Sequence, residues 1–267
     1  MHAGRTAVVA GRGQAGIAAA CELADAGWRV TLIEKRPFLG GRSYSYTDKA
    51  TGMEIDNGQH VFLGCCTEYI RLLDRLGIRD RAHLQKRLRV PVIDKVWGTS
   101  VLSAVNLPPP LHLLASLLKF KSLSPAEKAA AGLAFAAIQS LDRAKHPELD
   151  DITFAEWLLS KRQSPHAIGS LWNLIIQPTL NDHVSRVSAD LALMVFQEGF
   201  LRSRTGANVG WAKVGLTPLI SEAAISYITA RGGEVRLNET IRGVQTEEGR
   251  VCSLATDYGE VKADAYV

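Results

Sequence analysis

Glycines and an acid near the start of the chain have the types and spacing that bind a dinucleotide. The segment Gly11–Gly16 has the form G-x-G-x-x-G and lies between an apolar run at 6–10 and an expected helix at 17–26. Its first glycine permits a tight turn, its second lets the backbone approach a pyrophosphate, and its third lets the helix pack on the strand. Glu34 ends a second apolar run at 30–33, where its carboxylate can accept hydrogen bonds from both ribose hydroxyls. This order of elements predicts a βαβ unit that binds a dinucleotide.

A second pair of glycines distinguishes FAD from the nicotinamide dinucleotides. Gly40 and Gly41 again let the backbone come close to a cofactor, and Arg42 adds a cation near the phosphates. The acid at Glu34 would repel a 2′-phosphate, which disfavours NADP. We therefore expect FAD, with these cofactor contacts: Gly11, Gly13, Gln14, Ala15, Gly16, Glu34, Lys35, Gly40, Gly41 and Arg42.

Longer segments of the chain resemble a known family. Residues 11–46, GRGQAGIAAACELADAGWRVTLIEKRPFLGGRSYSY, are similar to the amine oxidase and phytoene desaturase superfamily of FAD enzymes. Residues 56–65, DNGQHVFLGC, resemble the squalene-associated members, the hydroxysqualene dehydroxylases, as do parts of 107–114, 172–181 and 200–219. The resemblance covers the whole chain. It implies an α/β fold, with a Rossmann-like FAD-binding domain of the glutathione reductase or amine oxidase type and a mainly helical substrate domain.

Helix-start signals recur in the middle of the chain. A hydroxyl cap followed by proline occurs at Ser124-Pro125, Ser164-Pro165 and Thr217-Pro218. Beyond Gly233 the pattern changes to short strands separated by turn signals. The middle of the chain is therefore expected to be helical and its end to consist of strands.

The family resemblance sets the expected domain organisation. It implies that the first strand after Gly233 lies beside the Glu34 strand and that the backbone of Ile241 meets the adenine ring. We expect a discontinuous FAD-binding domain at 1–75 and 205–267, around a mostly helical, membrane-facing substrate domain at 76–204. The family continues beyond the strand that begins near the end of this chain, so we expect a C-terminal truncation.

An imidazole is the main candidate for acid–base chemistry. The resemblance implies that residues 56–60 lie close to the flavin, with Gly58, Gln59 and His60 as further cofactor contacts. His60 can exchange a proton near neutral pH, and the alternatives are a hydrogen bond to the loop backbone or a contact that fixes the flavin. Asp56 can orient His60 or cap a following helix. Asp56 and His60 are therefore the candidate catalytic residues.

Composition argues against several classes of function. The chain has 267 residues and a formal net charge of +4, which is too small to indicate a nucleic-acid partner. Its 4 cysteines have no metal-ligand spacing, so no metal site is expected. The apolar start is interrupted by Arg5, and no apolar run approaches the ~20 residues that span a bilayer. We expect a cytoplasmic protein without a signal peptide.

Two segments favour attachment to a membrane surface. Residues 71–95 contain eight Lys or Arg against three Asp, and residues 111–120, LHLLASLLKF, are strongly apolar. A basic patch beside an apolar helix suits peripheral docking on the inner face of the cytoplasmic membrane. A solvated face beside a core helix explains the same pattern equally well.

The resemblance implies a redox reaction on an isoprenoid. Reduced FAD would deliver a hydride as the hydroxyl leaves hydroxysqualene, giving squalene in squalene and hopanoid biosynthesis. Two alternatives stay open: a squalene or phytoene-type carotenoid desaturase, in which the hydride moves the other way, and a non-redox prenyl-chain carrier of the same fold. The expected partner is a small isoprenoid substrate, and the sequence leaves the oligomeric state open.

Overall fold

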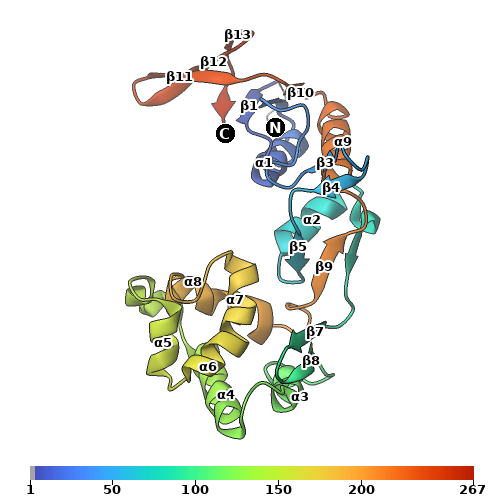
Figure 1. Ribbon diagram of the computed structural model, residues 1–267. Coiled ribbons are helices and arrows are strands. Elements are labelled where there is room, and N and C mark those ends of the chain that lie inside the picture. Colours follow the sequence, from blue (N-terminus) through green and yellow to red (C-terminus); the bar gives the residue numbers. More distant parts are fainter. Residues whose placement is uncertain (1–3) are drawn as a thin grey trace. The chain divides into compact units, whose positions relative to one another are not determined.

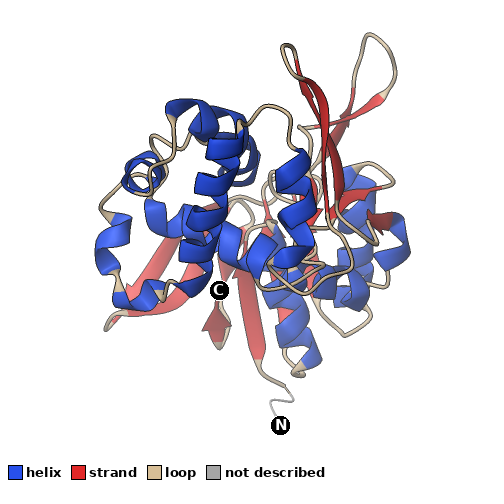
Figure 2. Cartoon of the chain, turned by 90° about the horizontal axis from the view of Figure 1, so that it is seen from below, coloured by secondary structure: helices blue, strands red, loops and turns tan. Residues whose placement is uncertain are grey.

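The computed structural model describes residues 4–267, which form two compact units (Figure 1). Unit 1 comprises the residues up to 61, together with 67–83 and 211–267, and unit 2 comprises 62–66 and 84–210. The described chain contains both helices and strands (Figure 2), as the expected α/β fold class requires.

The boundaries of the units differ from the expected ones after residues 75 and 204. Residues 76–83 stay with unit 1, because Ile78 is buried and the Arg81 carbonyl accepts a hydrogen bond from Lys213 N at 2.9 Å. Residues 62–66 and 205–210 belong to unit 2. There the amides of Gly64 and Cys65 each donate at 2.9 Å, to the carbonyls of Asn208 and Gly206.

A parallel four-stranded sheet in the order β10-β2-β1-β14 forms the centre of unit 1. Helix α1 packs on this sheet, and α9 packs on α1. On the sheet, Leu254 contacts the buried side chains of Val8 and Ile33. The predicted strand after Gly233 is confirmed beside the strand that carries Glu34. These elements are β1 (Thr6–Ala10), α1 (Gln14–Asp25), β2 (Arg29–Glu34), α9 (Leu216–Thr229), β10 (Glu234–Leu237) and β14 (Ala265–Tyr266).

Shorter elements complete unit 1. Strands β11, β12 and β13 form an antiparallel meander, and β3 pairs with β4 in a hairpin. The chain passes between the units within β5, after Cys66, within β6 and within β9. The bounds are β3 (Ser45–Thr47), β4 (Glu54–Asp56), β5 (Val61–Leu63), α2 (Thr67–Arg75), η1 (Arg79–Arg81), β6 (Ala82–Leu84), β9 (Val209–Ala212), β11 (Ile241–Glu247), β12 (Arg250–Thr256) and β13 (Gly259–Val261).

The start of α9 corrects one prediction. The helix begins at Leu216 rather than at the Thr217-Pro218 signal. The Thr217 hydroxyl does not cap the helix, because it accepts a hydrogen bond from Ser45 N at 2.8 Å. Instead Asp56 Oδ1 accepts from Leu216 N at 3.0 Å. The cap therefore comes from strand β4, far away in the sequence.

Unit 2 is mostly helical and contains one β-hairpin, β7-β8. The predicted helix starts at Ser124 and Ser164 are confirmed, because each hydroxyl accepts a backbone N–H of the first turn. The core is built on aromatic rings, with the centroids of Trp172 and Phe196 5.1 Å apart. The elements are β7 (Arg89–Asp94), β8 (Gly98–Ser103), η2 (Leu111–Leu113), α3 (Leu114–Lys119), α4 (Pro125–Ser140), η3 (Arg143–Lys145), η4 (Pro147–Asp150), α5 (Phe154–Ser160), α6 (Pro165–Ala167), η5 (Ile168–Trp172), α7 (Asn173–Leu180), α8 (Ala189–Val195) and η6 (Phe196–Leu201).

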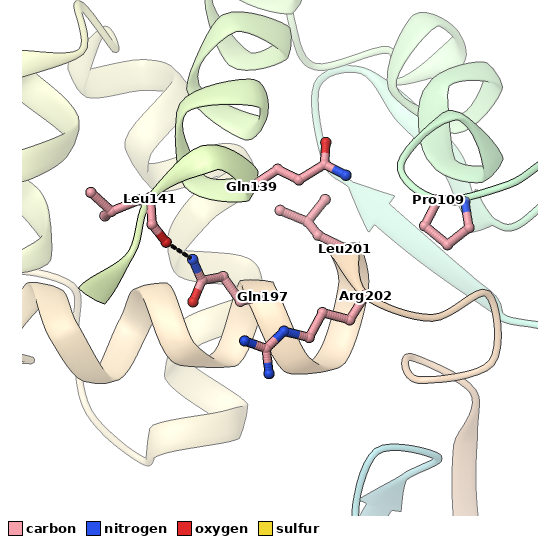
Figure 3. A pocket seen from close by; sticks show the side chains of 6 residues that line it. All are labelled: Pro109, Gln139, Leu141, Gln197, Leu201 and Arg202. Atoms are coloured by element: carbon pink, nitrogen blue, oxygen red, sulfur yellow. Dashed lines mark hydrogen bonds between the residues drawn. The ribbon is translucent and has the colours of Figure 1, made fainter. Parts of the chain in front are cut away.

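A cavity of about 330 Å³ in unit 2 lies beside the C-terminal end of α4 (Figure 3). The Gln197 side chain donates hydrogen bonds to the carbonyls of Ile138 and Leu141, both at 2.8 Å, and accepts one from Arg143 Nε at 3.1 Å. These bonds fix the C-terminal end of α4, so the polar side chain at the centre of this cavity has a structural role. The lining residues are Pro109, Gln139, Leu141, Gln197, Leu201 and Arg202.

Candidate cofactor site

The glycine turn between β1 and α1 is tightly packed at Gly16 and open at Gly13. Gly11 has φ +115°, a conformation that other residues rarely adopt, and its amide donates to the Ile33 carbonyl at 3.0 Å. A Cβ on Gly16 would lie 2.3 Å from the Gly11 carbonyl oxygen, so only glycine lets α1 sit this close. A Cβ on Gly13 would meet nothing within 4 Å. The second glycine therefore faces open space, where a ligand can approach the backbone.

The start of α1 offers hydrogen-bond donors to that space. Gly13 precedes the helix without a side-chain cap, and the first turn contains no acidic residue. The amides at the start of an α-helix, here those of Gln14, Ala15 and Gly16, have no partner within the helix. Together with the positive end of the helix dipole, these groups can bind a phosphate.

Glu34 lies at the end of β2 and is 7% exposed. Its carboxylate accepts hydrogen bonds from Arg12 N at 3.1 Å and from Arg36 N at 2.8 Å. The Arg12 Nε lies 3.5 Å from Oε1, so the carboxylate is also ion-paired. Since a carboxylate has about four acceptor positions, Glu34 retains capacity for a ribose hydroxyl.

Arg12, at the variable position between the first two glycines, is a residue that sequence reasoning missed. Its guanidinium carbon lies 4.2 Å from the centroid of the Phe38 ring, and its Nη1 donates to the Phe38 carbonyl at 3.2 Å. Burial lowers the pKa of the Arg12 guanidinium, against the opposing effect of Glu34. These contacts fix the orientation of Glu34. The sequence did contain a signal for this role: Arg12 is a basic residue within the glycine motif, and the motif is followed by the acid Glu34.

The second glycine pair packs against the first motif. Gly40 and Gly41 have φ of +122° and +67°, and Gly40 N donates to the Arg12 carbonyl at 2.8 Å. A Cβ on Gly41 would lie 2.9 Å from the Gly13 Cα. The structure therefore brings both glycine motifs together, as expected for one cofactor site. Lys35 and Arg42 are exposed beside this turn, and the Arg42 carbonyl accepts from Asn57 Nδ2 at 3.3 Å.

The segment that carries His60 lines a separate cavity of about 320 Å³ in unit 1. His60 is exposed, and its Nδ1 lies 2.9 Å from the Gly58 carbonyl. Donation from Nδ1 to that carbonyl leaves Nε2 as the acceptor. Trp211, which the sequence did not single out, lines one wall of the cavity, and its ring centroid lies 4.3 Å from that of His83. The lining residues are Asp56, Gln59, His60, Val61, Trp211 and Ala212.

Asp56 lies in the same cavity wall but makes its hydrogen bonds elsewhere. Its Oδ1 accepts from Ser45 Oγ at 2.8 Å and from the Leu216 amide at 3.0 Å. Asp56 thus caps α9, which begins 160 residues later, and not the next helix along the chain as the sequence suggested. Ile241, at the start of β11, packs with Val8 and Ile33 on the nucleotide-binding sheet. Among residues 4–267 no group of His, Cys, Asp and Glu could hold a metal ion.

Comparison with known proteins identifies the family. The family described as flavin containing amine oxidoreductase matches residues 14–267. The chain belongs to this family. FAD is its cofactor, and the glycine turn fits that cofactor, because the open space at Gly13 meets the uncapped amides of α1 and the Glu34 carboxylate.

Similar proteins in this flavin oxidoreductase family include carotenoid desaturases. The chain is 30% identical to the zeta-carotene desaturase of Zea mays over 279 residues, covering 97% of this chain and 48% of that protein. It is 26% identical to the 15-cis-phytoene desaturase of Synechococcus elongatus, covering 97% of this chain and 56% of that protein. The chain thus spans about half the length of the curated relatives it matches.

Solved structures show the same fold. Putrescine oxidase bound to putrescine matches with a TM-score of 0.70 at 21% identity, covering 98% of this chain and 57% of that one. The Rab GDI of Plasmodium falciparum matches with a TM-score of 0.58 at 13% identity, covering 98% of this chain and 64% of that one. At these identities the likeness establishes the α/β fold alone.

Proposed function

We propose that the chain carries the FAD-binding site of a desaturase that removes hydrogen from a long isoprenoid. The strongest support is the alignment of 97% of the chain with zeta-carotene desaturase. The relatives named as phytoene desaturases align over the same share of the chain. The glycine turn adds independent support, because its shape suits a dinucleotide.

In this proposal the chain's own residues bind and orient the cofactor. The amides at the start of α1 bind the pyrophosphate, and Glu34, which is ion-paired with Arg12, binds the ribose hydroxyls. Bound FAD supplies the hydride acceptor. His60 lines the cavity of unit 1, and with Nδ1 bound to the loop its Nε2 is the atom that exchanges a proton.

Hydroxysqualene dehydroxylation is the finer alternative, supported by the DNGQHVFLGC segment at 56–65. The two reactions move the hydride in opposite directions. Desaturation transfers a hydride from substrate carbon to oxidised flavin, and a proton leaves the neighbouring carbon as the double bond forms. Dehydroxylation transfers a hydride from reduced flavin to carbon, while the C–O bond breaks and a proton converts the leaving hydroxide to water.

The first experiment is the visible absorption spectrum of the chain after reconstitution with FAD and removal of free cofactor. Retained flavin bands support the proposal. Their absence from a folded chain contradicts it and favours the prenyl-carrier alternative. Product analysis then uses a form extended to the relatives' full length, with phytoene and oxidised FAD or with hydroxysqualene and reduced FAD. New double bonds support the desaturase, squalene supports the dehydroxylase, and neither product from a flavin-loaded protein contradicts both.

His60 is tested in the same extended form. We expect His60→Ala to retain FAD, because the imidazole is exposed and bonds only its own loop. Loss of turnover of about 10²-fold or more with FAD still bound supports proton exchange at His60. Unchanged turnover in His60→Ala excludes that role, and His60→Gln controls for the lost loop hydrogen bond.

A further inference from the structure

The apolar segment 111–120 of unit 2 exposes three of its five leucines. Leu111, Leu114 and Leu118 follow one another at spacings of three and four along η2 and α3, so they form one stripe. They are 48%, 45% and 59% exposed. A helix on the surface of a soluble protein normally turns such a stripe toward the core.

Hydrogen bonds on the opposite face hold the stripe outward. Ser116 is buried, and its Oγ accepts from Ser103 N at 3.0 Å and donates to the Val101 carbonyl at 3.1 Å. These bonds attach α3 to the outer edge of β8. Phe120 is buried in the core of unit 2. Because Ser116 and Phe120 anchor the inner face, the leucine stripe cannot rotate inward.

The adjacent hairpin presents further apolar side chains. Ile93 and Val96 are each 81% exposed and Trp97 is 52% exposed at the tip between β7 and β8. The Asp94 carboxylate accepts from Val96 N at 2.7 Å and from Trp97 N at 2.9 Å, which fixes this tip. The other Asp94 oxygen accepts from Ser122 Oγ at 3.4 Å, just beyond α3. The hairpin tip and α3 are therefore tied into one rigid surface.

Cations accompany these apolar side chains. Lys95 lies in the tip, and Lys119 and Lys121 follow the stripe. All three are exposed, and none of them forms an ion pair within residues 4–267. By contrast, part of the basic stretch noted in the sequence lies in unit 1 and is paired. Arg75, for example, contacts Glu22 at 2.6 Å and Asp25 at 3.4 Å. The three lysines beside the hairpin tip and the leucine stripe are therefore free to meet an anionic surface.

We propose that the hairpin tip, residues 93–97, and the leucine stripe with Lys119 and Lys121 dock on an anionic phospholipid bilayer. Leucines and a tryptophan suit the boundary between headgroups and acyl chains, and the lysines complement anionic headgroups. No helix within the described residues is long and apolar enough to cross a membrane, so the contact is one with the surface. This docking does not depend on which redox reaction the protein catalyses.

Vesicle co-sedimentation of the whole chain tests the proposal. We expect binding to phosphatidylcholine vesicles that contain phosphatidylglycerol, weaker binding to phosphatidylcholine alone, and release by salt. The double variant Leu114→Glu with Leu118→Glu should lose binding to both kinds of vesicle. The double variant Lys119→Gln with Lys121→Gln should lose about fivefold in affinity per lysine on the anionic vesicles only. The matched control is Leu159→Glu on α5, because Leu159 is 54% exposed and lies in the same unit. This variant should bind vesicles as tightly as the parent chain.

Three outcomes would overturn the proposal. The first is absence of vesicle binding by a chain that circular dichroism shows to be folded. The second is equal loss of binding in Leu159→Glu, which would mean that the surface has no special role. The third is a dimer in sedimentation velocity that Leu114→Glu with Leu118→Glu converts to a monomer, because the occupant would then be a second copy of the chain.

Discussion

Four helices of unit 2 and the glycine-turn helix of unit 1 begin in opposite ways. In unit 2, α4, α5, α6 and α8 begin after a hydroxyl residue whose side chain accepts a hydrogen bond from the amide three residues on. In unit 1, α1 begins after Gly13, which has no side chain to offer. At these four helices of unit 2 a side chain satisfies a backbone N–H of the first turn, whereas at α1 of unit 1 the corresponding N–H groups are left to the cofactor.

Helix α9 shows that a glycine start alone does not make a binding site. Its N-cap, Gly215, also lacks a side-chain cap, but Asp56 reaches across from β4 to accept from Leu216 N. A Cβ on Gly215 would lie 2.5 Å from the Glu54 carboxyl carbon, whereas one on Gly13 would meet nothing within 4 Å. Empty space in front of an uncapped helix is what separates the cofactor site from an ordinary helix start.

The largest effect is expected where the helix start meets the glycine turn. In Gly16→Ala the new Cβ would lie 2.3 Å from the Gly11 carbonyl oxygen, and neither backbone segment can move freely. We expect a loss of about 3 kcal/mol in the free energy of unfolding, together with loss of FAD binding. Denaturant unfolding checks this expectation. A Gly16→Ala chain as stable as the parent would show that the turn adapts and is not a rigid cradle.

A large effect is also expected at the best-capped start in unit 2. Glu127 accepts from Ser124 N at 2.9 Å, from Ser164 Oγ at 2.5 Å and from His166 Nδ1 at 3.0 Å, and so joins α4 to α6. We expect Glu127→Gln to cost about 2 kcal/mol, because an amide cannot accept from all these donors. Thermal unfolding near neutral pH measures the loss, and FAD binding in unit 1 serves as the internal control.

The same carboxylate makes the stability of unit 2 depend on acid. The hydrogen bond from Ser164, followed by that from Ser124 N, lowers the pKa of Glu127 from 4.5 to about 2. The ionised form is favoured in the folded chain, so its stabilising effect is complete above about pH 4.5 and is lost as the pH falls toward 2. Glu127→Gln should be less sensitive to acid across that window. Equal acid sensitivity in both chains would contradict this assignment.

A smaller effect is expected at the cap supplied from a distance. Asp56→Ala removes the acceptor for Leu216 N and should cost about 1 kcal/mol, whereas Asp56→Asn keeps an acceptor and should cost less. Both variants should retain FAD, since Asp56 is not part of the glycine turn. Turnover in an extended form separates this role from catalysis. If Asp56→Asn is stable and still loses activity, the carboxylate acts in the reaction as well as in the fold.

Sequence reasoning succeeded where the determining contacts are local. The glycine turn follows β1 directly, and the positive φ of Gly11 and the close packing of Gly16 both arise within the same βαβ unit, so type and spacing were sufficient to predict the turn. The serine caps of unit 2 are local in the same way. Arg12 was overlooked because its importance depends on Glu34 and Phe38, which reach it only once β2 lies beside β1.

Contacts between distant segments could not be predicted. Asp56 caps a helix that begins 160 residues later, and Trp211 joins His60 in one cavity from the other end of the chain. The basic stretch 71–95 was treated as one patch, but the chain passes from unit 1 to unit 2 after residue 83. Charge counted along the sequence therefore combined cations that belong to different surfaces.

The smallest change in stability tests the comparison most directly. Gly13 has φ −62° and ψ 165°, close to the φ −67° and ψ 161° of the N-cap Ser124. Gly13→Ser should therefore cap α1 as Ser124 caps α4, raising the stability of the chain without flavin by a few tenths of a kcal/mol, roughly. The same side chain occupies the space through which the pyrophosphate approaches, so FAD affinity should fall by about tenfold or more.

Two measurements separate the cap from the obstruction in this variant. Fluorescence titration with FAD and denaturant unfolding of the flavin-free chain are compared for Gly13→Ser and Gly13→Ala. The alanine should obstruct FAD without satisfying an amide, so it should lose affinity without gaining the cap. If Gly13→Ser binds FAD as tightly as the parent, the uncapped start of α1 is not the pyrophosphate site. The difference between the two units would then reflect only the choice of capping residue.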